Sequence, residues 1–220
     1  MNRKKIPFLV TQGCLYALFL GLDLFLPGSG LDVPIKYLSI LLCFCYLLGH
    51  TQNADVRLTR AALAFTLLAD LFLLVLDRWY TAGVASFCVV QALYLARIHR
   101  AGDRPLGCRL AIRGGIAAAL LAVGAFLGVL NTLTVLTLLY FSQLTANAFA
   151  ALALGRRGRI LAVGLFLFMG CDLCVGLCNL APLLPDAPVL VALPFAQVGM
   201  WLFYLPSQVL ITLSAGKLCD

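Results

Sequence analysis

Two aspartates, Asp70 and Asp172, lie deep inside long apolar segments. An aspartate near the centre of a bilayer costs about 2.5–3.5 kcal/mol, so such a residue is a candidate for function. Asp70 follows Arg60 by ten residues, and Asp172 follows Arg159 by thirteen. On helices that run in the same direction, this spacing predicts that both carboxyls lie about 15–20 Å from the basic ends. Two acids at one depth could share a cavity and divide the roles of general acid and general base.

The same two acids have a simpler explanation, in which each carboxyl is hydrogen-bonded to a neighbouring helix and only stabilises the bundle. All nine acidic residues of the chain are aspartates. The other seven are expected near the membrane surfaces: Asp32, Asp55, Asp103, Asp186 and Asp220 in loops or the tail, and Asp23 and Asp77 at helix ends. The sequence thus limits the deep acids to one pair.

A second set of polar residues could line the same cavity. Several of them are spaced by three, four or seven positions and therefore share one face of a helix. The candidate substrate-binding residues are Lys36, Gln91, Tyr94, Tyr140, Asn147, Tyr204 and Gln208. Each alone is also explained by hydrogen bonding between helices, and Lys36 by an ammonium that reaches the headgroups or faces Asp23. Together they indicate a polar-lined interior.

The composition predicts an integral membrane protein, in the cell membrane if the chain is bacterial. Of 220 residues, 63% are hydrophobic and 11% charged, and the mean hydropathy is +1.02. Apolar runs of about 17–25 residues, long enough to span a bilayer as helices, leave little chain for a soluble domain. We expect one all-α domain over residues 1–220, a multi-pass transmembrane helical bundle of about eight helices. These are expected at residues 6–26, 34–49, 58–77, 79–98, 109–130, 132–154, 160–180 and 188–213.

The basic residues predict the orientation of the bundle. Across eight spans, 14 of the 16 Lys and Arg residues fall on one side, and only Lys36 and Arg78 on the other. Excess Lys and Arg in short loops marks the cytoplasmic side, so both chain ends are expected inside. This asymmetry explains the net charge of +7 without nucleic acid as a partner. It also explains the Arg-rich central segment, for which anionic lipid headgroups are an alternative partner.

Two further interpretations concern the organisation of the chain. The long connection near residues 96–109 divides the helices four and four, so halves 1–100 and 105–220 would be parallel repeats. The basic start of the first helix is also compatible with a cleaved secretory signal. The length of that apolar run and the presence of Asp23 argue against cleavage.

Three cysteines, Cys171, Cys174 and Cys178, surround Asp172 and raise the question of a metal site. Closed zinc sites usually combine Cys with His, and both histidines are expected at the cytoplasmic border. Small cysteines that pack between helices are the better interpretation. We therefore expect neither a metal nor a cofactor.

Several segments resemble the YhhN-like family of eight-helix membrane proteins, which includes the lysoplasmalogenases. The segment 35–38, Ile-Lys-Tyr-Leu, is similar to the family's Lys-Pro-Leu segment. The segment 65–74 resembles its small-Asp-apolar helix, and Gly83, Phe87 and Tyr94 match the following Gly-x3-Phe-x3-His-x2-Tyr helix. The segment 168–173 is similar to the second Asp helix, and Tyr204 with Gln208 matches the last helix. Gln91 stands where the family has His, and Tyr37 where it has Pro.

The resemblance implies hydrolysis of the vinyl-ether bond of a lysoplasmalogen, with a lysophospholipid as substrate and membrane lipids as surroundings. The products would be a fatty aldehyde and a glycerophospho-ethanolamine or -choline. Protonation of the alkene carbon by one aspartic acid gives an oxocarbenium ion, which water attacks while the other carboxylate takes the proton. Asp70 and Asp172 are the expected catalytic pair.

Other functions use two membrane aspartates as well. A transporter or lipid-binding protein could carry protons on the pair, and a purely structural protein could use both as hydrogen-bonding groups. An intramembrane aspartyl protease would need a Gly-x-Gly-Asp motif, but the residues before Asp172 include Met169 and Cys171. A turnover assay compared with an uptake assay separates the enzyme from the transporter.

Overall fold

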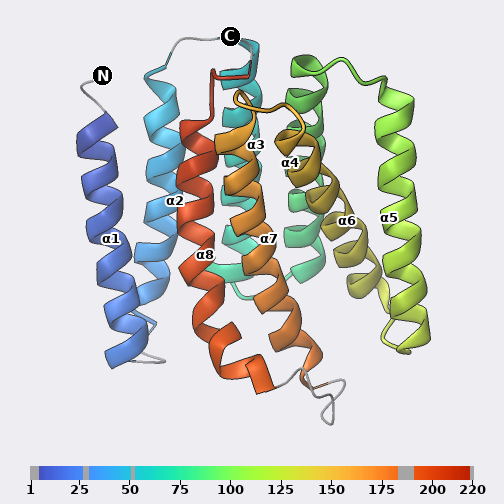
Figure 1. The fold of residues 1–220 in the computed structure, drawn as a ribbon. Helices are drawn as coiled ribbons and strands as arrows, with labels where there is room; N and C mark the ends of the chain where they lie inside the picture. The colour runs from blue at the N-terminus through green and yellow to red at the C-terminus, as the bar shows by residue number, and fades with distance from the viewer. Residues whose placement is uncertain (1–4, 27–29, 51–52, 183–190, 219–220) are drawn as a thin grey trace.

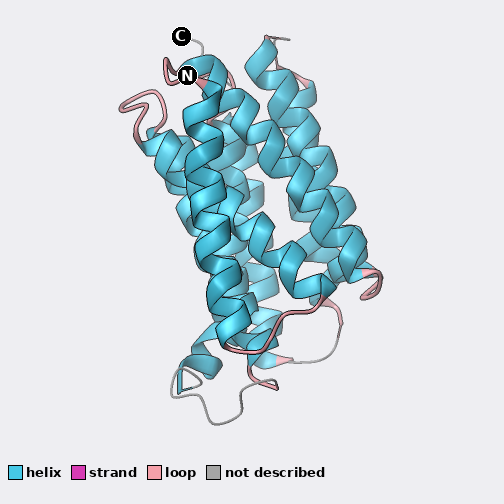
Figure 2. Ribbon diagram, turned by 90° about the vertical axis from the view of Figure 1, so that its right-hand side faces the viewer, coloured by secondary structure: helices cyan, strands magenta, loops and turns pink. Residues whose placement is uncertain are grey.

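The computed structural model describes residues 5–26, 30–50, 53–182 and 191–218, which form eight α-helices and contain no strand (Figures 1 and 2). The all-α fold is confirmed. The helices are α1 (Lys5–Phe25), α2 (Asp32–Leu48), α3 (Ala54–Asp70), α4 (Tyr80–Ala101), α5 (Leu106–Phe126), α6 (Thr132–Leu152), α7 (Arg159–Leu180) and α8 (Leu193–Leu213), with a short π-helix, η1 (Leu71–Val75), between α3 and α4.

Most expected helix boundaries agree with the structure to within a few residues, and two need comment. The helix expected over 58–77 changes to π-helical winding after Asp70 and ends at Val75. Asp77 and Trp79 then have positive φ angles of 46° and 55°, which turn the chain back into α4. The last helix was expected from residue 188, but α8 begins at Leu193, and residues 188–190 lie outside the described part.

In the described part, seven helices are long and apolar enough to cross a membrane, counting α3 together with η1. The eighth, α2, has 17 residues. That length is at the lower limit for a membrane-spanning helix, about 17 residues. The chain is therefore an integral membrane protein, as the composition predicted.

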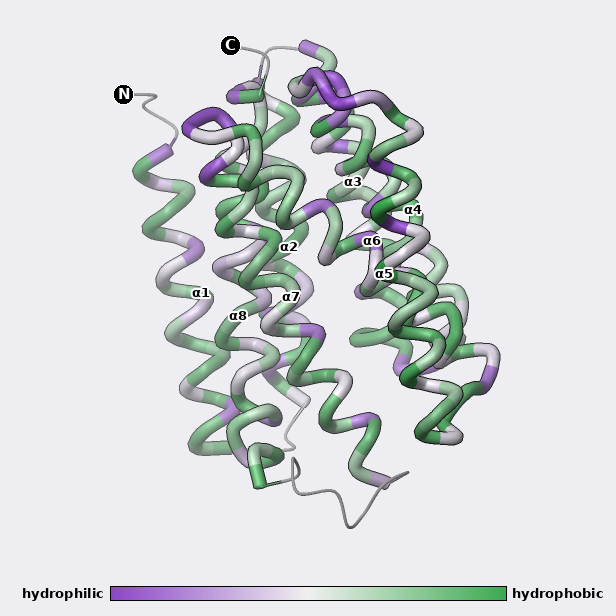
Figure 3. Tube along the Cα trace, turned by 45° about the vertical axis from the view of Figure 1, so that its right-hand side comes forward, coloured by the Kyte–Doolittle hydropathy of each residue, from purple (hydrophilic) through white to green (hydrophobic). Residues whose placement is uncertain are grey.

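Successive helices alternate in direction, so α1 starts and α8 ends at the same end of the bundle (Figure 1). We refer to this end as the terminal end. Hydrophilic residues gather there, while the middle of the bundle is apolar (Figure 3). The arrangement agrees with the basic asymmetry of the sequence. The cytoplasmic assignment of this end, and the relation of halves 1–100 and 105–220 as repeats, stay predictions.

The orientation can be measured by labelling single cysteines in a variant without the native cysteines. Arg156→Cys lies in the exposed turn between α7 and α6, and Leu127→Cys lies at the opposite end of the bundle after α5. We expect an impermeant thiol reagent to label Leu127→Cys from outside intact cells and Arg156→Cys only after permeabilisation. Labelling of both from the same side would contradict the topology.

Helices α7 and α8 pack closely because a glycine faces the partner backbone. A Cβ at Gly164 of α7 would lie 3.2 Å from the Ser207 carbonyl oxygen and 2.9 Å from Ile211 Cγ1, both on α8. Small residues allow this close approach between membrane helices, where dispersion contacts drive packing. The contact places Tyr204, one turn before Gln208 on α8, beside the middle of α7.

Pro206 lies inside α8 and changes the hydrogen bonding one turn earlier. Proline has no N–H, so the carbonyl oxygen of Leu202, four residues earlier, loses its helical donor. The hydroxyl of Tyr16 on α1 donates to that oxygen at 2.8 Å. A carbonyl freed inside a membrane helix needs such a partner, and here the partner also attaches α1 to α8.

A buried ion pair at the terminal end corrects the expected position of Asp55. The sequence placed this residue in a loop, but it lies in the first turn of α3 with 2% of its surface exposed. Arg97 of α4 donates to its two carboxylate oxygens at 2.7 and 3.2 Å and to Ser214 Oγ at 3.2 Å. The Gly216 N–H also donates to Asp55. The pair thus connects α3, α4 and the end of α8.

Candidate functional site

Asp70 is the last residue of α3, immediately before the π-helix η1, and only 5% of it is exposed. The Tyr204 hydroxyl on α8 lies 2.7 and 2.8 Å from its two oxygens. Short π-helical segments change the direction of side chains and often occur at functional sites. Gly83 of α4 accommodates this one, because a Cβ there would lie 2.5 Å from Leu73 Cγ of η1.

Asp172 of α7 is bound by a second tyrosine. The hydroxyl of Tyr140 on α6 donates to Asp172 Oδ2 at 2.5 Å. The other oxygen, Oδ1, has no hydrogen-bond partner among the described residues, and Asp172 is partly exposed. Each deep aspartate therefore has one tyrosine partner from a different helix, but only Asp172 has an oxygen free of that partner.

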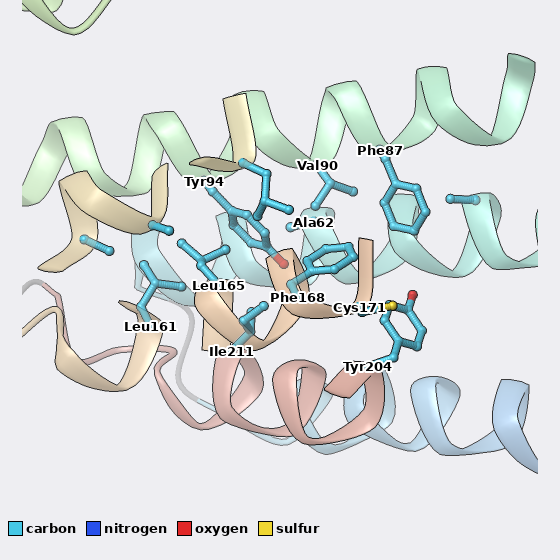
Figure 4. Close-up of a cluster of buried hydrophobic side chains, with 14 of the residues drawn as sticks. Ala62, Phe87, Val90, Tyr94, Leu161, Leu165, Phe168, Cys171, Tyr204 and Ile211 are labelled. Carbon is cyan, nitrogen blue, oxygen red and sulfur yellow. The ribbon is translucent and has the colours of Figure 1, made fainter. Parts of the chain in front are cut away.

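The two Tyr–Asp pairs meet at Phe168 of α7. The Phe168 ring centroid lies 5.5 Å from that of Tyr204 and 6.4 Å from that of Tyr140. Cys171, one turn further along α7, is buried in the same cluster as Phe168 and Tyr204. Figure 4 shows Phe168, Cys171 and Tyr204 next to one another in the core. The structure thus brings both tyrosines together with both aspartates; the shared open cavity stays a prediction.

The sequence left two roles open for Lys36, contact with lipid headgroups or pairing with Asp23. The structure shows the pairing. Its ammonium lies 2.8 Å from Asp23 and 2.6 Å from Asp32, and 4% of the side chain is exposed. It also lies 4.5 Å from the centroid of the Trp201 ring, a cation–π contact. Trp201 contacts the Tyr204 ring edge-on at 5.5 Å. Lys36 is therefore two side chains away from Asp70, on the side opposite to the terminal end.

Gln91 and Asn147 are hydrogen-bonded to each other. The Asn147 amide donates to the side-chain oxygen and the backbone oxygen of Gln91, both at 2.9 Å. Arg113 of α5 donates to the Asn147 oxygen. Both ends of the Asn147 amide are thus engaged, whereas Gln91 Nε2 is buried without a partner among the described residues. Of these two residues, only Gln91 therefore has a side-chain donor available for the predicted contact with substrate.

Tyr94 and Gln208 are fully buried, and their polar atoms have no partner among the described side chains. Thr66 Oγ1 shares this property. Thr66 lies one turn before Asp70 and Gln208 one turn after Tyr204, on antiparallel helices, so both lie one turn towards the terminal end from the Asp70–Tyr204 pair. Unpaired buried polar atoms cost free energy, so these groups are available to bind water or a polar ligand.

No group of three or more His, Cys, Asp or Glu residues in the described ranges could hold a metal ion. Cys171, Cys174 and Cys178 are instead free thiols on α7. Cys174 Sγ lies against Gly199 of α8, where a Cβ would approach it to 2.9 Å. At least this thiol has a packing role between helices.

A family model for the YhhN family matches residues 31–215, which contain α2 to α8 and both aspartates. The chain belongs to the YhhN family. Comparisons with curated proteins and with solved structures returned no match. The resemblance inferred from the sequence motifs is confirmed.

The YhhN motif residues of α4 now have structural explanations. Gly83 allows α4 to approach η1, and Phe87 stacks on Tyr140 with centroids 5.5 Å apart. Tyr37, which replaces the proline of the YhhN segment in α2, is partly buried and packs against the core. Sequence reasoning included Phe168 only as part of the second Asp segment and did not mention Trp201. In an apolar helix, an aromatic residue at a site is indistinguishable from one that faces lipid.

Proposed function

We propose that this YhhN protein hydrolyses the vinyl-ether bond of lysoplasmalogens, releasing a fatty aldehyde and a glycerophospho-ethanolamine or -choline. The observation that carries the proposal is the pair of Tyr–Asp hydrogen bonds, Tyr204–Asp70 and Tyr140–Asp172, which meet at Phe168. Two acids in an apolar core suit a reaction that needs one proton donor and one proton acceptor. Membership of the YhhN family is compatible with this activity.

In the proposed reaction, an aspartic acid protonates the alkene carbon next to the ether-bearing carbon, and an oxocarbenium ion forms. The second aspartate stabilises this cation and takes a proton from the attacking water. The second carboxyl, now protonated, then gives its proton to the glycerol oxygen as the C–O bond of the hemiacetal breaks, and the first carboxylate takes the proton of the hemiacetal hydroxyl as the aldehyde forms. One water is consumed for each bond cleaved, both carboxyls return to their starting states, and no redox step occurs.

The different surroundings of the two aspartates support different roles. Asp172 keeps one oxygen without a protein partner and is partly exposed, so we assign the proton donor to Asp172. Both oxygens of Asp70 lie within hydrogen-bonding distance of Tyr204, and a phenol that donates to a carboxylate stabilises its charge. We therefore assign cation stabilisation and water activation to Asp70.

The deciding experiment is incubation of the purified protein with a lysoplasmalogen and, separately, with its saturated alkyl-ether analogue. Aldehyde should form only from the vinyl ether, because the saturated chain has no alkene carbon to protonate. If a folded preparation released no aldehyde from either lipid, the proposed hydrolysis would be wrong. Proton-coupled uptake in vesicles by the same preparation would then favour the transporter function.

Loss of the hydroxyl of Tyr204 or Tyr140 should lower kcat, because each hydroxyl donates a hydrogen bond to one of the two aspartates. Tyr204→Phe and Tyr140→Phe each remove one bond to a charged or reacting group, worth about 1.5–3 kcal/mol. We expect kcat to fall about 10- to 100-fold in each variant. The control is Tyr46→Phe, the same chemical change on a tyrosine of α2 that stacks on Phe8. Unchanged kcat in both site variants would contradict the geometry.

Gln91 should affect substrate binding more than turnover. An amide has no useful pKa for acid–base work, and the buried Nε2 of Gln91, with its two N–H donors, has no partner among the described residues. Gln91→Ala should raise KM several-fold while kcat changes little. A large gain in kcat for Gln91→His would instead show that this position takes part in proton transfer in the YhhN pattern.

A further inference from the structure

A groove runs between α4, α5 and α6 at the terminal end, separate from the aspartate site. Helix α5 lies at the edge of the bundle and packs on α6 (Figure 1). Two adjoining pockets, of about 350 and 200 Å³, share the lining residues Arg104, Arg109 and Ala150. The larger pocket is at the connection between α4 and α5, and the smaller one continues along α5 and α6 towards the middle of the bundle.

Four arginines line this groove, Arg104, Arg109, Arg113 and Arg157, against a single carboxylate, Asp103. Only 4% of Arg109 and 3% of Arg113 are exposed. Within residues 53–182 no ion pair joins any of these arginines to an aspartate, since the one ion pair in that range is Arg97 with Asp55. The positive-inside rule accounts for basic residues on this side of the membrane, but it needs only exposed charges in loops. It does not explain why Arg109 and Arg113 are buried.

The polar contacts of the two buried arginines are all to neutral groups. Arg109 Nε donates to the Arg104 carbonyl oxygen at 3.3 Å, and Arg113 Nη1 donates to the Arg109 carbonyl oxygen at 3.2 Å. Arg113 Nε is buried with no partner among the described residues. Burying a guanidinium away from water costs several kcal/mol unless a negative charge compensates it. The groove therefore has a deficit of negative charge and a free donor.

The smaller pocket combines its arginines with apolar side chains. Ile112, Ile116, Ala146 and Phe149 line the smaller pocket beside Arg113. Ile112 is 45% exposed and Phe149 56% exposed, so this wall also faces the lipid around the bundle. Ile116 lies one turn beyond Arg113 along α5, towards the middle of the bundle, so the α5 wall passes from arginines to an apolar side chain in the order of headgroup and acyl chain in a phospholipid.

We propose that this groove binds one phospholipid of the leaflet at the terminal end, with its phosphate on Arg109 and Arg113 and an acyl chain along Ile112, Ile116 and Phe149. A phosphate compensates both buried charges, and guanidinium groups bind phosphate oxygens with two parallel hydrogen bonds. The free Nε of Arg113 supplies one donor. The proposal does not rest on the proposed hydrolysis, because the lipid that the groove holds need not contain a vinyl ether.

The test measures lipid binding to the purified full chain by native mass spectrometry and by thermal shift. The probes are dioleoyl phosphatidylglycerol, diolein with the same chains but no phosphate, and inorganic phosphate. Phosphatidylglycerol should bind as one tightly held molecule and raise Tm, and diolein should do neither. Displacement of the bound lipid by millimolar inorganic phosphate would overturn the lipid assignment, since the site would then take the free anion.

Two kinds of variant address the groove itself. Arg109→Gln with Arg113→Gln should weaken phosphatidylglycerol binding at least about tenfold, because charged hydrogen bonds are lost. The matched control, Arg100→Gln with Arg156→Gln, removes two exposed charges at the same end of the bundle and should bind normally. Ala150→Phe keeps all arginines but fills space that both pockets share, so it tests the site even if the double variant does not fold. Unchanged binding in Ala150→Phe would overturn the proposal.

The variant Asp172→Asn tests whether the measured lipid binds in the groove or at the aspartate site. Its phosphatidylglycerol binding should equal that of the parent protein, whether or not the chain hydrolyses lysoplasmalogens. A loss of binding in Asp172→Asn would mean that the measured lipid occupies the aspartate site, and it would overturn the groove as the binding place.

Discussion

Asp70→Asn and Asp172→Asn should each abolish aldehyde release from a lysoplasmalogen while leaving the bundle folded. Asparagine keeps the size of the side chain and an oxygen that accepts from Tyr204 or Tyr140, but it cannot transfer a proton. Removal of a general acid or base costs about 10²- to 10⁴-fold in rate. The double variant should be no slower than the worse single variant, because residues that act as one unit are strongly non-additive.

The control for these variants is Asp77→Asn, the same change in an exposed residue outside the helices. It should retain full activity, and all variants should keep the Tm of the parent to within a few degrees. Normal turnover by either site variant would exclude the carboxyl pair as the catalytic unit. Additive losses in the double variant would mean that the two aspartates act in separate steps or sites.

The largest effect on stability is expected at the buried pair of Arg97 and Asp55. Arg97→Met leaves the Asp55 carboxylate, 2% exposed, with only the Gly216 N–H as a partner, and removes the bond to Ser214. Breaking a buried ion pair by removing one partner costs about 3–5 kcal/mol. We expect a decrease of that size in the free energy of unfolding, measured by denaturant titration in detergent.

A second substitution at the same pair tests this explanation. Arg97→Met combined with Asp55→Leu should recover much of the loss, because replacing both charges by apolar groups removes the uncompensated carboxylate. Arg100→Met is the matched single control, since Arg100 is exposed on the same helix. A double variant less stable than Arg97→Met would show that hydrogen bonds to the end of α8, rather than the unpaired charge, dominate the stability.

The helix count and the membrane location could be predicted because both depend on local properties. An apolar run of sufficient length must satisfy its own backbone hydrogen bonds as a helix, whatever its neighbours are. The same reasoning identified Asp70 and Asp172, since an acid inside such a run is costly wherever the helix packs. The family resemblance rested on these same segments, and the match over residues 31–215 confirmed it.

The change to π-helical winding after Asp70 could not be predicted in this way. Leu71–Val75 consists only of Leu, Phe and Val residues, so its sequence carries no sign of an altered hydrogen-bond pattern. The close contact of Leu73 with Gly83 of α4 accompanies that winding, and it exists only once two helices are packed. The expected end at residue 77 lies two residues beyond Val75, but the sequence did not show that the last turn before it is π-helical.

The sequence by itself determined a bundle of apolar helices with two deep aspartates and a basic end. Only the tertiary structure decided which polar groups meet. Tyr204 reaches Asp70 across 134 positions, Arg97 reaches Asp55 across 42, and Arg113 is buried against Asn147 across 34. Such partners depend on the rotation and tilt of each helix about its neighbours. In a membrane these are set by close packing and by glycines such as Gly164, because the lipid is as apolar as the helix surfaces and no hydrophobic driving force orients one helix against another.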